Sequence, residues 1–365
     1  MSNLEANRVY NFNPGPATLP LEVLKEAQAE FLNFNNSGMS IIEISHRSKP
    51  YEQVHAQTKA DILDLMDLGD DYEVLFIQGG ASLQFAMIPM NFATPEHKGN
   101  YVLSGTFSTN AYKEAATLGV GEIAASSKDT GFHHVPQQDE LKISKNAAYL
   151  HICNNNTIYG TEFHYIPKTN GVPLFADMSS DMLSRPYDFK KFDFIYAGVQ
   201  KNLGPAGVVL VVAKKLLIEK SLETLPTMLR YDTFYKKDSL YNTPPEFCIY
   251  MVGKVAKWIK AQGGLTAMAE RNAKKAKLLY DAIDNSDGFY RGHADKDSRS
   301  FMNVTFRLPN EELEKKFVAE ALEHKLSGVK GHRSVGGMRA SIYNAMPIEG
   351  VVALAEFMDN FRKNN

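Results

Sequence analysis

Residues 192–212 read FDFIYAGVQKNLGPAGVVLVV, and this stretch decides the fold. Its two apolar runs, residues 194–197 and 208–212, are typical of strands that are buried on both faces. Lys201 stands in the short, glycine-bounded connection between them. Lysine is strongly hydrated and usually lies at the surface, so an ammonium partly desolvated here would have a lowered pKa and could act as a nucleophile. A solvated loop lysine is the alternative that this segment alone leaves open.

A second apolar run, residues 172–176, ends at Asp177. Open α/β sheets present ligand-binding groups at the carboxyl ends of their strands, so this carboxylate would face a cleft. Pyridoxal 5′-phosphate (PLP) needs an anionic partner on its pyridine nitrogen, because the protonated ring accepts electrons from a carbanion at the substrate's Cα. Asp177 could be that partner, and Lys201 could form a Schiff base with the cofactor. A turn or helix-capping aspartate is the alternative interpretation.

Residues 73–85, EVLFIQGGASLQF, have the order strand, glycine turn, helix. Free backbone N–H groups in such a turn and the positive end of the helix dipole form an anion site, to which Ser82 adds a hydroxyl. The dinucleotide fingerprint G-x-G-x-x-G and the P-loop pattern G-x-x-x-x-G-K-[ST] are both absent here. A single phosphate therefore fits better than a dinucleotide or a triphosphate, although glycines that serve only the backbone turn remain the alternative.

The order of these elements, phosphate site, aspartate and lysine, predicts a PLP enzyme of the aspartate aminotransferase fold type. Strand-like runs at 101–103, 148–153 and the two segments above alternate with helix-length stretches, so we predict an α/β fold with a mostly parallel sheet. Two further residues could complete the cofactor pocket. Phe107 could stack on the pyridine ring, and Thr157 could donate to its phenolic oxygen. A place in the hydrophobic core is the alternative for Phe107.

The chain resembles the phosphoserine aminotransferase family in segments spread over nearly its whole length. These segments are FNPGPATLP (12–20), EISHRS (43–48), GGASLQF (79–85), ADMSS (176–180), GVQKNLGPAG (198–207), YNTPP (241–245) and GHRSVGGMRASIYNAM (331–346). The resemblance implies PLP-dependent transfer of an amino group from L-glutamate to 3-phosphohydroxypyruvate, giving O-phospho-L-serine and 2-oxoglutarate in serine biosynthesis. Some bacterial members also supply 4-phosphohydroxy-L-threonine for vitamin B6 synthesis, and the sequence leaves that step open.

The resemblance also assigns the cofactor contacts. Lys201 would carry PLP as a Schiff base and move the proton between Cα and C4′, while Asp177 would pair with the ring nitrogen. The other contacts would be Gly80, Ala81, Ser82, Phe107, Thr157, Gln200, Asn242 and Thr243. Many relatives have tryptophan where this chain has Phe107, which can still stack. Asn242 and Thr243 match residues that reach the PLP phosphate of the neighbouring subunit, so a homodimer with shared active sites is implied; without the resemblance, a polar turn is the alternative.

Five basic residues would bind the substrate. Arg339 matches the arginine that grips the α-carboxylate, for which a guanidinium offers a bidentate fork. His46 with Arg47, and His332 with Arg333, match groups that receive the distal phosphate or the side-chain carboxylate of glutamate. The two pairs are far apart in sequence and would converge in space. Isolated arginines are usually solvated surface residues, so these assignments depend on the matched segments around them.

With 365 residues, of which 44% are hydrophobic, the chain can form a large domain and a smaller one. The resemblance implies a large domain with a sheet of the seven-stranded type and a smaller α+β C-terminal domain. We place the large PLP-binding domain at 16–265 and the small domain at 266–365, with residues 1–15 as an arm that packs on the latter. Helical periodicity near 311–326 and 348–362, and strand-like runs at 301–306 and 339–343, fit that α+β lobe.

The N-terminus lacks a signal pattern and no stretch approaches about 20 apolar residues, so we expect a cytoplasmic enzyme that binds no membrane. No metal-ligand spacing occurs. Three alternatives remain. A glyoxylate or pyruvate aminotransferase would not need the two His-Arg pairs. A desulfurase or lyase would need a cysteine on a late loop, yet none follows Cys248. A PLP-binding regulator would need a basic nucleic-acid-binding domain, for which no length is spare.

Overall fold

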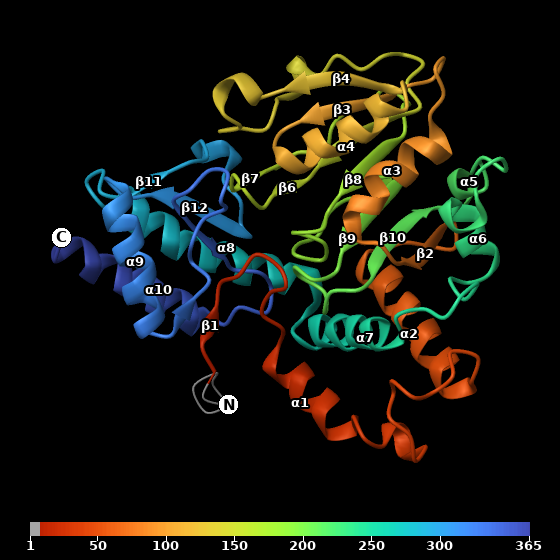
Figure 1. Cartoon of the computed structure of the whole chain (residues 1–365), viewed down its shortest axis with the longest axis horizontal. Coiled ribbons are helices and arrows are strands. Elements are labelled where there is room, and N and C mark those ends of the chain that lie inside the picture. Colours follow the sequence, from red (N-terminus) through yellow and green to blue (C-terminus); the bar gives the residue numbers. More distant parts are fainter. Residues whose placement is uncertain (1–7) are drawn as a thin grey trace.

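A seven-stranded sheet lies at the centre of the larger part of the molecule in the computed structural model, which describes residues 8–365 (Figure 1). In spatial order its strands are β2 (Tyr72–Ile77), β10 (Val209–Lys214), β9 (Phe194–Gly198), β8 (Leu174–Asp177), β5 (Tyr149–Cys153), β3 (Gly99–Leu103) and β4 (Gly121–Ser126). β10 is antiparallel to both of its neighbours, and every other pair in this sheet is parallel. The predicted α/β fold with a mostly parallel sheet is confirmed.

Helices cover both faces of this sheet (Figure 1). One face is covered by α1 (Leu21–Glu30), α2 (Lys49–Leu65) and α7 (Glu246–Ala261), and the other by α3 (Gly80–Phe92), α4 (Thr106–Thr117), α5 (Lys215–Ile218) and α6 (Tyr231–Lys236). Two covered faces leave no polar side for the central strands, which is why their sequences are continuous apolar runs.

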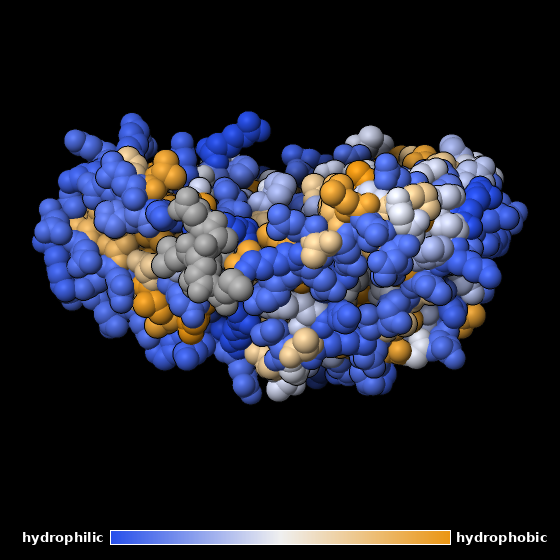
Figure 2. All heavy atoms as spheres, turned by 90° about the horizontal axis from the view of Figure 1, so that it is seen from below, coloured by the Kyte–Doolittle hydropathy of each residue, from blue (hydrophilic) through white to orange (hydrophobic). Residues whose placement is uncertain are grey.

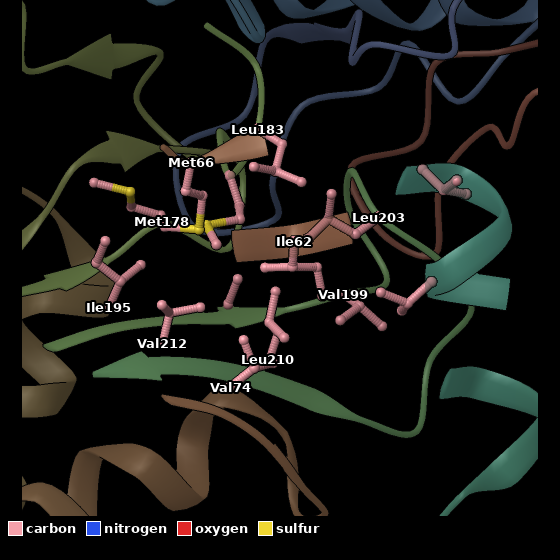
Figure 3. Close-up of a cluster of buried hydrophobic side chains, with 14 of the residues drawn as sticks. Ile62, Met66, Val74, Met178, Leu183, Ile195, Val199, Leu203, Leu210 and Val212 are labelled. Carbon is pink, nitrogen blue, oxygen red and sulfur yellow. The ribbon is translucent and has the colours of Figure 1, made fainter. Parts of the chain in front are cut away.

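The side chains of each central strand alternate between two hydrophobic clusters. Along β10, Leu210 and Val212 belong to the cluster beneath α2 and α7, while Val209 and Val211 belong to the cluster beneath α3 and α4. This is the alternation that a pleated strand imposes. Figure 3 shows the first cluster, where Ile62 of α2 lies over the side chains of the strands. The two clusters fix the sheet, and with it the edge on which the site residues stand.

The C-terminal part forms a smaller lobe with its own hydrophobic core (Figure 1). It contains a three-stranded antiparallel sheet and three helices: α8 (Gly264–Asp284), β11 (Arg291–Gly292), β12 (Asn303–Arg307), α9 (Glu311–Glu323), β14 (Met338–Ser341) and α10 (Ile348–Lys363). Helix α8 joins the two parts, because Leu265 and Met268 pack in the core of the large part while Leu279 and Ile283 pack in that of the lobe. The cores therefore divide inside α8, and the boundary at residue 265 stays a prediction.

The N-terminal segment is attached to the small lobe. Strand β1 (Tyr10–Asn11) pairs in parallel with β13 (Leu326–Ser327), and Tyr10 and Phe12 lie in the core of the lobe. From there the chain crosses to the large part, where the backbone N–H of Ala17 donates to the carbonyl of Gln200 at 3.0 Å. Residues 1–7 of the predicted arm lie outside the described residues. The crossing brings the N-terminal segment to the residue next to Lys201.

Some elements differ from the sequence-based expectation. Strand β4 was not predicted, because it is an edge strand with a half-exposed, weakly apolar sequence. Helix α9 ends at Glu323, three residues before the predicted end.

Within residues 8–365, no helix combines the length and apolarity that a membrane crossing requires. Figure 2 shows one face of the molecule, where hydrophilic residues predominate and hydrophobic ones occur in separate patches.

Candidate active site

Five predicted site segments follow strands at one edge of the central sheet. Gly80 follows β2, Phe107 follows β3, Thr157 follows β5, Asp177 ends β8 and Lys201 follows β9. These strands run in the same direction, since only β10 is reversed. Their carboxyl ends therefore meet at one edge, which is where open α/β sheets bind ligands.

Lys201 points at the residues predicted to share its pocket. Its Nζ donates to Oγ1 of Thr157 at 2.7 Å and lies 4.6 Å from the centroid of the Phe107 ring. Burial lowers the pKa of Lys201, and the nearby Asp177 carboxylate opposes that shift. Among the described residues no carboxylate is hydrogen-bonded to this amine, and an amine with a lowered pKa is suited to nucleophilic and acid–base chemistry.

Asp177 is buried and is oriented by a neighbouring residue. The backbone N–H and the hydroxyl of Ser179 donate to Oδ1 of Asp177 at 2.9 and 2.6 Å. The Ser179 hydroxyl in turn accepts from the N–H of Gly198 at 3.0 Å. Among the described residues, the other oxygen, Oδ2, has no hydrogen-bond partner. A protonated ring nitrogen would supply that partner.

The turn before α3 has the properties of an anion site. Gly79 and Gly80 both have left-handed backbone conformations, with φ of 96° and 67°, and no side chain caps the helix. The first N–H groups of α3 are therefore open to a ligand. Asn242 donates to Gln78 at 3.3 Å, and Gln78 donates to the carbonyl of Thr243 at 3.2 Å. Asn242 and Thr243 thus lie beside this turn of their own chain, and their predicted reach into a neighbouring subunit stays a prediction.

Arg339 on β14 is a buried cation with unused donors. The residue is only 6% exposed. Its Nη1 donates to the main-chain carbonyl of Thr157 at 3.3 Å. Its Nε is buried and has no hydrogen-bond partner among the described residues. Burial lowers the pKa of Arg339. A carboxylate that accepted from this guanidinium would satisfy the free donors, because the fork binds carboxylates in a bidentate manner.

His332 lines the same small cavity as Arg339. Its Nδ1 accepts from the N–H of Ser334 at 3.2 Å, so Nε2 carries the proton of the neutral ring. Burial lowers the pKa of His332, and the positive charges of Arg339 and Arg333 lower it further. Arg333 is exposed, and its guanidinium has no partner among the described residues. The cavity therefore presents several N–H donors to an anion.

The second predicted His-Arg pair lies elsewhere in the chain. Nε of Arg47 donates to Nε2 of His46 at 3.3 Å, and Nδ1 of His46 lies 3.8 Å from a carboxylate oxygen of Glu246 at the start of α7. Within residues 8–365, no hydrogen bond or ion pair joins this pair to His332 or Arg333. Its predicted part in substrate binding therefore stays a prediction.

Two residues that sequence analysis did not single out hold the surroundings of Lys201. The hydroxyl of Tyr343 donates to the carbonyl of Pro14 at 2.7 Å, and the backbone N–H of Asn344 donates to Oδ1 of Asn202 at 2.9 Å. Both residues come shortly after β14 in the small lobe. They lie within the quoted segment 331–346, but no local pattern reveals contacts with residues so distant in sequence. They link the segment after the strand of Arg339 to Asn202, which follows Lys201, and to Pro14 in the N-terminal segment.

The asparagine run before Thr157 binds three buried partners. Asn154 donates to the carboxylate of Asp181. Asn155 donates to Oδ1 of Asn303 in β12 at 2.8 Å, which ties the site to the small lobe. Asn156 donates to Oγ1 of Thr161 at 3.0 Å. These amides are therefore part of a buried network that holds the chain between β5 and Thr157.

The pH dependence of stability should depend on Asp181. Burial, and after it the nearby Glu162 carboxylate, raise its pKa to about 7. The folded protein thus retains a proton that the unfolded chain releases near pH 4, so the free energy of unfolding should fall as the pH rises from about 4 to about 7, by an amount of order 1–4 kcal/mol. Asp181→Asn keeps an acceptor for Asn154 and Tyr187 but cannot ionise. Urea unfolding at several pH values should show a smaller fall in the variant, and parallel curves would contradict this account.

The donor set fits PLP. An aspartate with a free oxygen, a lysine held beside an aromatic ring, and uncapped amides at a helix N-terminus match the ring nitrogen, the aldehyde carbon and the phosphate respectively. The residues that stand at these positions are Asp177, Lys201 with Phe107, and the turn from Gly80 to Ser82.

Comparison with known proteins also indicates an aminotransferase. The family model of the class-V aminotransferases matches residues 9–354. A curated phosphoserine aminotransferase from Geobacillus kaustophilus is 56% identical over 356 residues, which cover 98% of this chain and 99% of that protein.

Solved structures agree with this match. The structure of a phosphoserine aminotransferase from Bacillus circulans subsp. alkalophilus is similar with a TM-score of 0.97 at 54% identity, covering 98% of this chain and 99% of that one. A PLP-bound phosphoserine aminotransferase from Trichomonas vaginalis has a TM-score of 0.89 at 39% identity, covering 96% and 100% of the two chains. Similarity of this extent in sequence and in structure exceeds what a shared fold alone would produce.

Proposed function

The chain belongs to the class-V aminotransferases and, within them, to the phosphoserine aminotransferases, and on that premise we propose that it transfers the amino group of L-glutamate to 3-phosphohydroxypyruvate. The products are 2-oxoglutarate and O-phospho-L-serine, as in serine biosynthesis. The equivalent step to 4-phosphohydroxy-L-threonine in vitamin B6 synthesis involves the same groups, a carboxylate and a distal phosphate, and is a second candidate reaction.

We propose that PLP is bound covalently to Lys201. The support is the amine itself, which is held at 2.7 Å from the Thr157 hydroxyl and has a pKa lowered by burial. Phe107 would stack on the ring, Asp177 would bind the ring nitrogen through its free oxygen, and Gly80 and Ser82 would help to bind the phosphate. When bound, PLP supplies an electron sink for the electrons released at the substrate's Cα.

Substrate binding and proton transfer would be carried out by side chains of this chain. Arg339 binds the α-carboxylate with donors that are otherwise unpaired, which fixes the direction of the Cα–H bond. Once the amino group of the substrate has released it from the cofactor, Lys201 would take the proton from Cα. Its Nζ and the guanidinium of Arg339 both donate to Thr157, so the amine lies close to the place proposed for the α-carboxylate. A buried site also excludes water from these steps.

The observation that carries the proposal is the position of Thr157 between the amine of Lys201 and the guanidinium of Arg339. Its hydroxyl accepts from Lys201 and its main-chain carbonyl accepts from Arg339. A carboxylate bound to Arg339 would thus place an amino acid within reach of Lys201. His332 lines the cavity of Arg339, and the charges of Arg339 and Arg333 both act on His332, so a second anionic group on the substrate could meet this His-Arg pair.

Single-turnover spectroscopy tests the proposal. The purified PLP form is mixed with O-phosphoserine, and serine and alanine serve as controls that share its α-carboxylate. Conversion of the cofactor to the pyridoxamine form by O-phosphoserine, with little response to the controls, is the expected result. An equal response to serine or alanine would instead favour a glyoxylate or pyruvate aminotransferase. The predicted homodimer, in which a second copy would contribute Asn242 and Thr243, is part of the same proposal.

A further inference from the structure

A loop at residues 330–337 carries His332 and Arg333 and leads directly into β14. Its ends are tied together, since the N–H of Gly331 donates to the carbonyl of Gly337 at 2.8 Å. This hydrogen bond closes the loop at its base. The positions of His332 and Arg333 therefore depend on what holds the base of the loop.

Two charged residues outside the loop hold that base. Arg307, the last residue of β12, donates from Nη1 to the carbonyl of Val335 at 2.5 Å. Glu314 in the first turns of α9 accepts through Oε2 from the N–H of Gly337 at 3.3 Å. Nε of Arg307 lies 2.8 Å from Oε1 of Glu314, a distance that makes an ion pair, although the N–H is not aimed well enough for a hydrogen bond. The pair thus contacts both the start and the end of the turn 335–337.

The loop lies directly on the Arg307 side chain. Gly336 and Gly337 have left-handed backbone conformations, with φ of 68° and 67°, which favour glycine. A Cβ atom on Gly336 would lie 2.8 Å from Nη1 of Arg307, and one on Gly337 would lie 2.5 Å from its Cδ. These distances leave no space for a side chain between loop and arginine. Glycine at positions 336 and 337 therefore allows the loop to lie this close to Arg307.

We propose that Arg307 and Glu314 are positioning residues that hold His332 and Arg333 at the mouth of the Arg339 cavity, and that they thereby set the preference for amino acids with a distal anion. The geometry supports this, because Arg307, His332 and Arg339 line one cavity. The inference rests on the proposed function, since it assigns a cause to the selection of a doubly anionic substrate. Arg307 itself is engaged by the loop and by Glu314, so it acts through the loop.

The two members of this pair differ in exposure, at 42% for the Arg307 side chain and 10% for that of Glu314. Arg307→Met should therefore cost some stability, because it leaves the buried carboxylate without its cation, whereas Glu314→Gln leaves only the half-exposed Arg307 unpaired. Arg307→Met removes the loop contact and the ion pair while it keeps an unbranched side chain of similar length. Arg307→Lys keeps the charge but loses the Nη1 donor, and Glu314→Gln keeps an acceptor for Gly337 but loses the charge.

The test uses single-turnover reactions of the full-length PLP-bound enzyme, with O-phosphoserine and alanine each varied in concentration. For Arg307→Met, the apparent dissociation constant of O-phosphoserine should rise about tenfold or more, because small displacements of a binding group have effects of that order. The limiting rate should stay within about threefold of the wild-type rate, and the alanine reaction should change little, since alanine has no distal group. The apparent dissociation constants of O-phosphoserine for Arg307→Lys and Glu314→Gln should lie between those of the wild-type enzyme and Arg307→Met.

Other outcomes would overturn the inference. Equal losses for O-phosphoserine and alanine would mean that the pair supports the lobe in general, and unchanged constants for both would mean that the loop holds its position without it. If Arg307→Met does not fold, the two milder variants decide between the same results. Failure of the proposed function is seen separately, because it would appear as a wild-type enzyme that does not prefer O-phosphoserine to alanine.

Discussion

Replacing Lys201 by alanine is expected to lower turnover by about 10³-fold or more, because one side chain supplies both the attachment point of the cofactor and the group that moves the Cα proton. The loss should be confined to activity. Within residues 8–365 the amine makes one hydrogen bond, to the Thr157 hydroxyl, and no ion pair, and burial disfavours its charged form, so its removal should cost little stability. Steady-state turnover and urea unfolding measure the two quantities.

The control for Lys201→Ala is a small primary amine added to the variant. Partial recovery of turnover with the added amine would show that the missing group is an amine and that the rest of the site is intact. Turnover that stays within about tenfold of the wild-type value without added amine would contradict the role of Lys201.

Replacing Arg339 by leucine is expected to lower kcat/KM by about 10²- to 10³-fold for every amino acid substrate, since the α-carboxylate loses a buried bidentate partner. Binding of PLP should change little, because the hydrogen bond of Arg339 goes to the carbonyl of Thr157 and leaves its hydroxyl free. Stability should be kept or increased, since the variant removes a buried cation whose Nε is unpaired. Kinetics with O-phosphoserine and alanine, together with PLP titration, measure these effects.

Arg333→Leu is the matched control for Arg339→Leu, since both replace an arginine near the same cavity by the same residue. The exposed Arg333 should affect O-phosphoserine far more than alanine, whereas Arg339 should affect both. If Arg339→Leu weakened only O-phosphoserine, Arg339 would bind the distal group and the proposed orientation of the substrate would be reversed. If Arg333→Leu weakened PLP as much as O-phosphoserine, its assignment to the substrate would be wrong.

Much of the large part was predictable from local sequence. The runs that became β8, β9 and β10 are continuous and apolar because these strands are buried on both faces, and the residues that follow them stand at one edge of the sheet. The edge strand β4 was missed, since only one of its six residues is buried and its apolar pattern is weak. Local patterns thus identify strands in proportion to their burial.

The site was predictable as far as its residues follow strands or lie in matched segments. Lys201, Thr157 and Phe107 do converge. The contacts of Tyr343 and Asn344 around Lys201 were not predictable, because they join residues more than a hundred positions apart. The same is true of the pair Arg307 and Glu314, whose role depends on the course of a loop. Contributions from a second subunit involve a partner that no single chain contains.

Reductive trapping tests the central claim most directly. The PLP-bound enzyme is reduced with borohydride, digested, and analysed by mass spectrometry to find the lysine that carries the cofactor. Lys275 is a second buried lysine whose pKa is lowered by burial, but its Nζ donates to the carbonyls of Ile342 and Tyr343 at 2.8 and 2.6 Å and is not free to react. The account predicts the label on Lys201 alone. A label on Lys275, or one distributed over surface lysines, would contradict it.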